Sequence, residues 1–287
     1  MPETVIEIEG LGKKYSLRHQ RGERYTALRD VIAEKTKRLF RRNGNRGQKL
    51  EIRNQQSDLR SPASDVQNSS TEEFRALRNV SFELEQGEVV GIIGRNGAGK
   101  TTLLNALLAS SPTIPESELR QTSGYDGPFL TGGKVTWGHE ASVGYFAQDH
   151  KQLIQKGSNV FDWLHQWEPG ASTEEIRGLL GQMLFQKEEG NKKTEALSGG
   201  EAARLLFCKL MLQKPNILVL DEPTNHLDLE SINALNIALQ RYPGTVLIVT
   251  HDHDLIDEVA TRIWHFENDH KITDFRGVYA EYQAVGV

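Results

Sequence analysis

The sequence has almost no cysteine and no long apolar segment. Cys208 is the one cysteine among 287 residues, which rules out an internal disulfide and suits a reducing compartment. No apolar run approaches the roughly 18 residues of a membrane span, and the polar first residues do not form a signal peptide. The net charge of −5 gives no overall argument for binding nucleic acid or membrane. We therefore expect a cytoplasmic protein that reaches a membrane only peripherally, at the inner face, or through a partner.

A glycine-rich loop between an apolar run and a helical segment is the strongest motif. Residues 94–101 fit the pattern G-x-x-x-x-G-K-[ST], whose backbone N–H groups turn toward a phosphate at a helix N-terminus. Lys100 would reach the β- and γ-phosphates, and the Thr101 hydroxyl would bind Mg²⁺. The candidate nucleotide-binding residues here are Gly94, Asn96, Gly97, Ala98, Gly99, Lys100, Thr101 and Thr102.

The beginning of the chain predicts a strand and a turn. Residues 5–9 alternate apolar and acidic side chains like a half-buried strand, and residues 10–15 follow as a glycine-containing turn. Two interpretations of Tyr15 stay open. It stacks on the adenine ring of a nucleotide, or it packs at the end of the strand.

A basic segment departs from the acidic balance of the chain. Between Lys13 and Arg60 there are fifteen Lys or Arg against five Asp or Glu. Apolar residues at helical spacing predict a basic amphipathic helix over residues 25–41, which either binds an anionic surface or a partner or simply keeps a solvated face. Residues 42–73 are poor in apolar residues, and we expect a disordered insertion.

The middle of the chain predicts a loop, two short strands and a group of helices. Residues 110–133 are rich in Ser, Pro, Thr and Gly and predict a loop, whereas residues 133–137 and 143–148 resemble strands. Helical periodicity predicts a helical subdomain over residues 155–195.

Three further motifs carry groups suited to phosphate chemistry. Ser198 precedes a helical run at an N-cap position, and Gly199 and Gly200 expose N–H groups that can meet a phosphate. The all-apolar run 217–220 is typical of a buried parallel strand. It leads to Asp221, which would hold Mg²⁺, and to Glu222, which would deprotonate the attacking water.

Residues 245–249, Thr245 followed by four apolar residues, predict a second buried strand, and a reactive side chain follows it. His251 follows this predicted strand and would contact the γ-phosphate. The candidate catalytic residues are therefore Glu222, His251 and Lys100.

In their order along the chain, these motifs resemble those of ATP-binding cassette (ABC) ATPases. The matching segments are Gly94–Thr101 (Walker A), Gln148 (Q-loop), Leu197–Glu201 (signature), Ile217–Glu222 (Walker B), Asn225–Asp228 (D-loop) and His251 (switch histidine).

The resemblance implies an α/β fold over residues 1–287, a P-loop NTPase nucleotide-binding domain of the ABC type with an antiparallel β-subdomain and a helical subdomain. It implies ATP and Mg²⁺ as cofactors, with Thr101, Gln148 and Asp221 at the metal. It also implies a head-to-tail dimer, with a second copy or another ABC cassette, in which Ser198, Gly199, Gly200 and Asp228 of one cassette meet the ATP of the other.

Two parts of the chain resemble different ABC subfamilies. Residues 1–105 resemble the ATP-binding subunits of polysaccharide, O-antigen or teichoic-acid exporters, which act with an integral-membrane transport subunit. Residues 133–287 resemble the second cassette of ABC-F proteins, soluble ATPases that act on the ribosome, above all in the run 224–231. The junction falls between Leu103 and Pro115. The exporter role is the main expectation, with the ribosomal role as its alternative.

Overall fold

The computed structural model describes residues 3–18, 71–125, 127–186, 188–267 and 271–285. The predicted basic helix over residues 25–41 lies outside them, and so does the predicted insertion up to residue 70. Strand β2 begins at Thr71, so the last three residues of the predicted insertion are strand. The chain divides into two units, Met1–Tyr15 with Arg75–Val287 and Ser16–Phe74, and the description below concerns the first.

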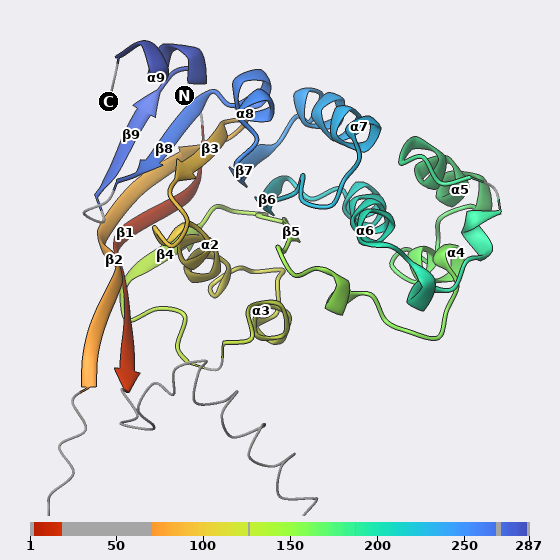
Figure 1. Cartoon of the computed structure of the whole chain (residues 1–287), viewed down its shortest axis with the longest axis horizontal. Helices are drawn as coiled ribbons and strands as arrows, with labels where there is room; N and C mark the ends of the chain where they lie inside the picture. The colour runs from red at the N-terminus through yellow and green to blue at the C-terminus, as the bar shows by residue number, and fades with distance from the viewer. Residues whose placement is uncertain (1–2, 19–70, 126, 187, 268–270, 286–287) are drawn as a thin grey trace, which may run out of the picture. The chain divides into compact units, whose positions relative to one another are not determined.

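A six-stranded sheet forms the centre of this unit (Figure 1). Its strands are ordered β5-β6-β7-β3-β8-β9, and all neighbours run parallel except the antiparallel pair β8 and β9. Since parallel strands end at one edge of a sheet, the residues that follow β3, β6 and β7 come together there. The strands are β3 (Val89–Gly94), β5 (Val143–Phe146), β6 (Ile217–Asp221), β7 (Thr245–Val249), β8 (Arg262–Phe266) and β9 (Ile272–Arg276).

A second sheet has the order β2-β1-β4, with β1 and β4 antiparallel as the sequence predicts. Its strands are β1 (Thr4–Arg18), β2 (Thr71–Glu85) and β4 (Gly132–Trp137). The predicted turn at residues 10–15 is wrong, because β1 continues through it to Arg18. Its register on β4 shifts between Glu9 and Gly12, and Gly10 has a φ of 58°. Glycine there lets the strand bulge without reversing.

Helices cover the central sheet and continue beyond it. They are α2 (Lys100–Leu108), α3 (Glu116–Ser123), α4 (Val160–His165), α5 (Thr173–Gln182), α6 (Gly199–Gln213), α7 (Leu229–Gln240), α8 (His253–Val259) and α9 (Tyr279–Val285), with short 3₁₀ helices at Lys151–Leu153, Glu189–Asn191 and Thr194–Ala196. Helices α4 and α5 lie within residues 155–195, the predicted helical subdomain. The prediction of a loop over residues 110–133 is wrong at α3, of which only Leu119 is buried.

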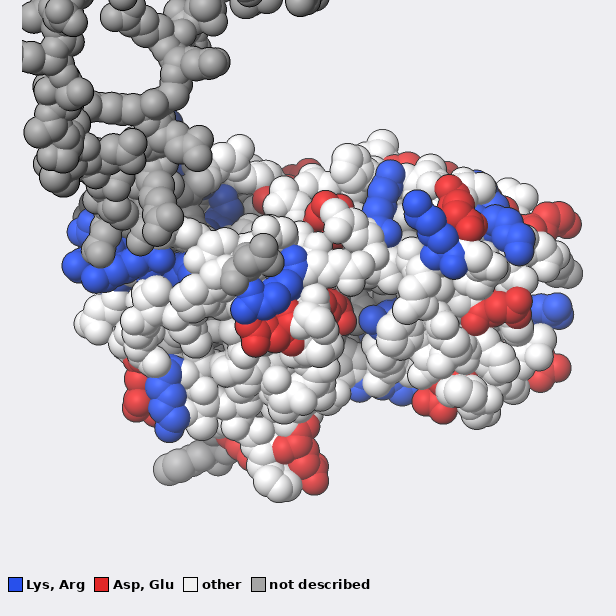
Figure 2. Space-filling model, turned by 90° about the horizontal axis from the view of Figure 1, so that it is seen from below, with Lys and Arg blue, Asp and Glu red and all other residues white. Residues whose placement is uncertain are grey.

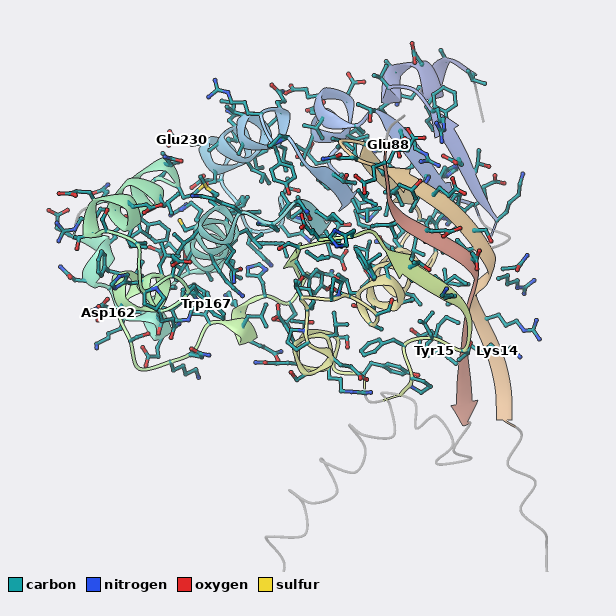
Figure 3. The ribbon with its side chains drawn as sticks, turned by 180° about the vertical axis from the view of Figure 1, so that it is seen from behind. Lys14, Tyr15, Glu88, Asp162, Trp167 and Glu230 are labelled. Carbon is teal, nitrogen blue, oxygen red and sulfur yellow. The ribbon has the colours of Figure 1, made fainter. Side chains whose placement is uncertain are left out.

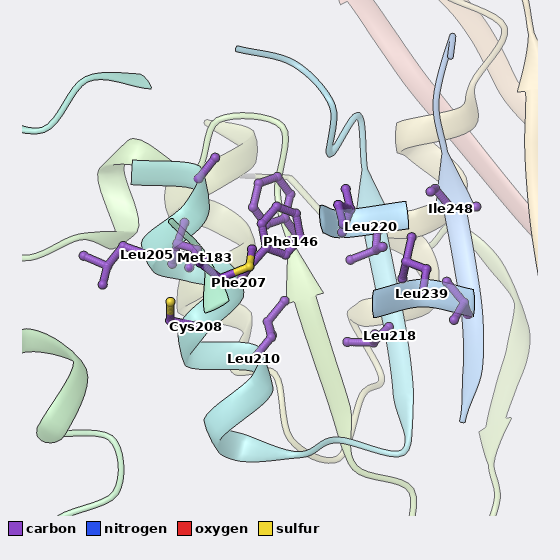
Figure 4. Close-up of a cluster of buried hydrophobic side chains, with 14 of the residues drawn as sticks. Phe146, Met183, Leu205, Phe207, Cys208, Leu210, Leu218, Leu220, Leu239 and Ile248 are labelled. Atoms are coloured by element: carbon purple, nitrogen blue, oxygen red, sulfur yellow. The ribbon is translucent and has the colours of Figure 1, made fainter. Parts of the chain in front are cut away.

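The two faces of the central sheet are both buried, as the all-apolar strands predict. Leu218 and Leu220 of β6 belong to the cluster in Figure 4, where the rings of Phe146 and Phe207 stack at 4.4 Å between centroids. The alternate residues Ile217 and Val219 belong to the other cluster. That cluster also contains residues of α2 and α3, so the segments on either side of the junction at residues 103–115 share one core.

None of the helices in the described part of the chain has the length and apolar character of a membrane-spanning segment.

Candidate functional site

The loop between β3 and α2 has the backbone of a phosphate cradle. Gly94, Gly97 and Gly99 have φ values of 141°, 79° and 104°, a region that residues with a Cβ rarely adopt. A Cβ on Gly94 would lie 2.7 Å from the carbonyl oxygen of Phe266 in β8. Helix α2 begins directly at Lys100, with Gly99 as its N-cap. The glycines therefore hold the loop in a left-handed backbone conformation directly before the N-terminus of α2, where exposed N–H groups favour an anion.

Lys100 folds back over this loop. Its Nζ donates to the carbonyl oxygens of Gly94, at 2.6 Å, and Arg95, at 3.1 Å. The side chain is buried, and this burial lowers its pKa, while the nearby carboxylates of Glu222 and Asp221 act in the opposite direction. Among the described residues its hydrogen bonds go to carbonyl oxygens, which this cation is suited to exchange for phosphate oxygens.

Asp221 ends β6 beside the cradle. Thr101 Oγ1 donates to its Oδ1 at 3.3 Å, and the side chain is fully buried. Its Oδ2 has no hydrogen-bond partner among the described residues. Burial raises the pKa of Asp221 to about 6, helped by the charge of Glu222 and opposed by Thr101 and Lys100. A buried carboxylate oxygen without a partner is a position that a cation would satisfy.

The residues present fit a magnesium ion. Thr101, Gln148 and Asp221 line one cavity of about 340 Å³, and each brings a side-chain oxygen. Mg²⁺ prefers oxygen ligands and is usually held by one or two carboxylates together with phosphates and waters. These are the three metal residues that the sequence predicts.

Glu222 and His251 form a pair at the same edge of the sheet. Glu222 Oε1 lies 3.3 Å from His251 Nε2, and the Glu222 side chain is buried while His251 is half exposed. The backbone of Glu222 is left-handed, with a φ of 51°, and its N–H donates to the Val249 carbonyl at 2.7 Å. Such a conformation costs roughly 1 kcal/mol or more outside glycine, and strain of this kind clusters at functional sites.

Tyr15 lies at the cavity that holds the metal residues. Its hydroxyl is 3.4 Å from Thr102 Oγ1, and its ring meets the ring of Tyr125 edge to face at 5.4 Å. Figure 3 labels it on β1, next to Lys14. Tyr15 and Thr102 both line the cavity, and the ring contact with Tyr125 is also a packing contact, so adenine stacking stays a prediction.

The other predicted loop residues surround a second cavity or the cradle itself. Gly94, Asn96 and His251 line a cavity of about 650 Å³ with residues of α8, β8 and α9. Gly97 has open space where a Cβ would stand, and Ala98 packs against the core cluster that contains α2.

The signature residues lie in a separate hollow. Ser198 caps α6 by accepting from Glu201 N at 3.2 Å, and Ser198 N donates to the Glu201 carboxylate at 2.7 Å. A Cβ on Gly200 would stand 2.7 Å from the His226 carbonyl oxygen. The absence of a side chain at Gly200 therefore leaves room for the backbone of the D-loop. The hollow, of about 820 Å³, is lined by Ser198, Gly199, Gly200 and Asp228, and none of its lining residues lines the other two cavities.

Several residues around these cavities are not among the site residues that the sequence predicts. Lys13, Asn105, Tyr125 and Tyr145 line the metal cavity, and Lys192, Arg204 and His226 line the signature hollow. Four of them lie on helices or strands and three on loops, and only the tertiary fold brings them to the cavities.

The fold and the site define a P-loop ATPase domain of the ATP-binding cassette type. Residues 77–225, a little more than half of the chain, match the family model described as ABC transporter, and the chain belongs to this family. The matched range includes the junction at residues 103–115.

The relatives agree with this assignment. The chain is 41% identical over 207 residues to "Probable ATP-binding protein YbiT" of Escherichia coli O157:H7, covering 72% of this chain and 36% of the relative. It is 33% identical over 212 residues to "ABC transporter F family member 5" of Arabidopsis thaliana, covering 74% and 28%. It is 34% identical over 207 residues to "Protein GCN20" of Saccharomyces cerevisiae, covering 72% and 25%. The chain thus spans about a third or less of the length of these relatives.

Proposed function

We propose that this ATPase hydrolyses MgATP at composite sites, formed when two cassettes meet head to tail. One observation carries the proposal. The metal cavity with Thr101 and Asp221 and the signature hollow with Ser198 are separate cavities with no lining residue in common. Each cassette therefore supplies two complementary halves, and a second cassette, identical or related, completes a site.

In this mechanism the residues act by position and charge. Lys100 and the loop N–H groups bind the phosphates, and Tyr15 stacks on the base. Thr101, Gln148 and Asp221 would hold a Mg²⁺ ion, which would supply positive charge against the phosphates. Glu222 accepts a proton from the attacking water, and His251, 3.3 Å from Glu222, contacts the γ-phosphate. Ser198 and Gly200, with Gly199 and Asp228 beside them, face that phosphate from the partner cassette.

The variant Glu222→Gln tests this function. It should keep ATP binding, lower turnover by roughly two orders of magnitude or more and accumulate an ATP-bound dimer, because the base is lost and the binding groups remain. Steady-state phosphate release and size-exclusion chromatography with ATP measure the two effects. Undiminished hydrolysis would remove Glu222 from its role, and a monomer at saturating MgATP would refute a composite site between two copies of this chain.

For the biological role we propose an ABC-F-type ATPase that acts on the ribosome. The resemblance of residues 133–287 supports this role, and one matched relative is named as an F family member. The names of the matched relatives give no support to polysaccharide export, the first expectation from residues 1–105. On the face in Figure 2, acidic and basic side chains are interspersed. The charge distribution of that face therefore favours neither the ribosome nor a membrane subunit as the partner.

Fractionation of a cell lysate tests the role. Glu222→Gln is loaded with ATP, and ribosomes, membranes and free protein are separated, with Lys100→Ala as the control that fails to close on ATP. ATP-dependent sedimentation with ribosomes supports the proposal. ATP-dependent flotation with membranes would overturn it in favour of an exporter subunit.

A further inference from the structure

The signature hollow contains a carboxylate at the place where the γ-phosphate of the proposed composite site would bind. Glu201 occupies the third position of α6 and lines the hollow together with Ser198 and Gly200. Its side chain is only 12% exposed, so water screens its charge weakly. The N-terminus of a helix attracts anions, but a bare carboxylate at this position would cancel that attraction.

Lys192 binds this carboxylate from a different element. Its Nζ lies 2.7 Å from Oε1 and 2.8 Å from Oε2 of Glu201, so the ammonium group bridges both oxygens. Lys192 directly follows the 3₁₀ helix Glu189–Asn191, in the segment that leads from α5 to the signature. Burial raises the pKa of Glu201, but Lys192 and Ser198 outweigh it and hold the pKa below its usual value, so the carboxylate stays ionised.

The charges around the hollow are closely balanced. Three cations and two carboxylates line it, which gives a net charge of +1: Lys151, Lys192, Arg204, Glu201 and Asp228. Arg204 pairs with Asp228 at 3.4 Å, and Lys192 pairs with Glu201. Without Lys192 the net charge would be zero, with the uncompensated carboxylate at the start of α6.

We propose that Lys192 is a positioning residue of the composite site, which neutralises Glu201 so that the start of α6 can receive the γ-phosphate held by the partner cassette. This proposal rests on the proposed head-to-tail dimer. It explains how a signature with an acidic fifth residue binds an anion. It also makes the segment after α5, which touches no nucleotide of its own cassette, part of phosphate recognition in the partner.

A series of charge variants in the Glu222→Gln background tests the proposal. Lys192→Gln brings the hollow to zero, Glu201→Gln brings it to +2, and the double variant restores +1. The dissociation constant of the ATP-bound dimer should rise roughly tenfold or more in Lys192→Gln, fall in Glu201→Gln and return to within about threefold of the parent in the double variant. Sedimentation equilibrium with ATP measures this constant. Raising the salt from about 0.05 M to 0.5 M should reduce the differences in dissociation constant between the variants.

Two controls separate charge from structure. Lys193→Gln removes the same charge one residue further along, outside the hollow, and should leave the dimer constant within about threefold. Binding of a fluorescent ATP analogue to the monomer should be equal in all variants, because Lys192 is absent from the residues that line the cavities around the P-loop.

Two results would overturn the proposal. One is Lys192→Gln dimerising like the parent. The other is a double variant as weak as Lys192→Gln, which would show that the ion pair acts only by holding the two segments together. A parent that binds ATP but never dimerises would remove the proposed composite site, and this proposal with it.

Discussion

Replacing Asp221 by Asn should stabilise the nucleotide-free protein while it abolishes activity. The pKa of the buried carboxyl is raised from 3.8 to about 6, which is about two pKa units, or roughly 3 kcal/mol against the charged form at neutral pH. Asn keeps the acceptor for Thr101 but leaves an amide where Oδ2 has no partner, at a cost of about 1–3 kcal/mol. The net gain at pH 7.5 is therefore about 0–2 kcal/mol, or up to about 8 °C in Tm.

The dependence on pH is the sharper part of this prediction. Between about pH 4 and 6 the folded protein holds the Asp221 proton, whereas the unfolded chain releases it. The folded state then binds more protons, so the stability of the parent falls as the pH rises through this window. The advantage of the variant should shrink by roughly 1–1.5 kcal/mol from pH 7.5 to pH 5.

Urea unfolding at the two pH values, with and without MgATP, measures both effects. MgATP should stabilise the parent and not the variant, because only the parent carries the metal carboxylate. With MgATP the parent should therefore be the more stable of the two proteins. Asp149→Asn, which removes an exposed carboxylate from the same cavity, serves as control and should change stability by less than about 0.5 kcal/mol. A variant that is less stable at pH 7.5, or a gain that is the same at both pH values, would refute the argument.

Three further variants test other parts of the site. Lys100→Ala should weaken ATP binding by roughly 10- to 100-fold, because it removes a charge-assisted bond, as measured by equilibrium dialysis; unchanged affinity would contradict the cradle. Tyr15→Ala should weaken ATP binding by roughly 5- to 100-fold through lost stacking, while Tyr15→Phe should bind like the parent, and equal affinity of all three would leave Tyr15 as a packing residue. Gly200→Ala should reduce the ATP-bound dimer of Glu222→Gln, since its Cβ would stand 2.7 Å from the His226 carbonyl oxygen; a dimer of parental stability would show that the D-loop yields easily.

The part of the fold that the sequence predicts best is the central sheet with its strand ends. Residues 217–220 and 246–249 are apolar throughout, a pattern that only burial on both faces explains, and the structure buries both faces. Because β6, β7 and β3 run parallel in one sheet, the positions of Asp221, Glu222 and His251 at one edge follow from topology alone.

Other features could not be predicted, for identifiable reasons. Helix α3 buries only Leu119, so it has no apolar period that would distinguish it from the polar loop around it. Lys192 and Tyr125 reach their cavities from loops, where a single side chain leaves no pattern. The turn predicted at residues 10–15 failed because glycine with a positive φ serves a bulge as well as a turn. The basic helix over residues 25–41 stays a prediction.

At Glu222, with its left-handed backbone, the residue that would be best for stability differs from the residue that hydrolysis needs. Glycine or asparagine would occupy this position with less strain than glutamate. A laboratory selection for thermal stability alone would therefore favour glycine or asparagine at residue 222. The selected variants would be more stable but would lack the base for hydrolysis. Residue 222 should therefore be left unchanged when this ATPase is mutagenised to raise its thermal stability.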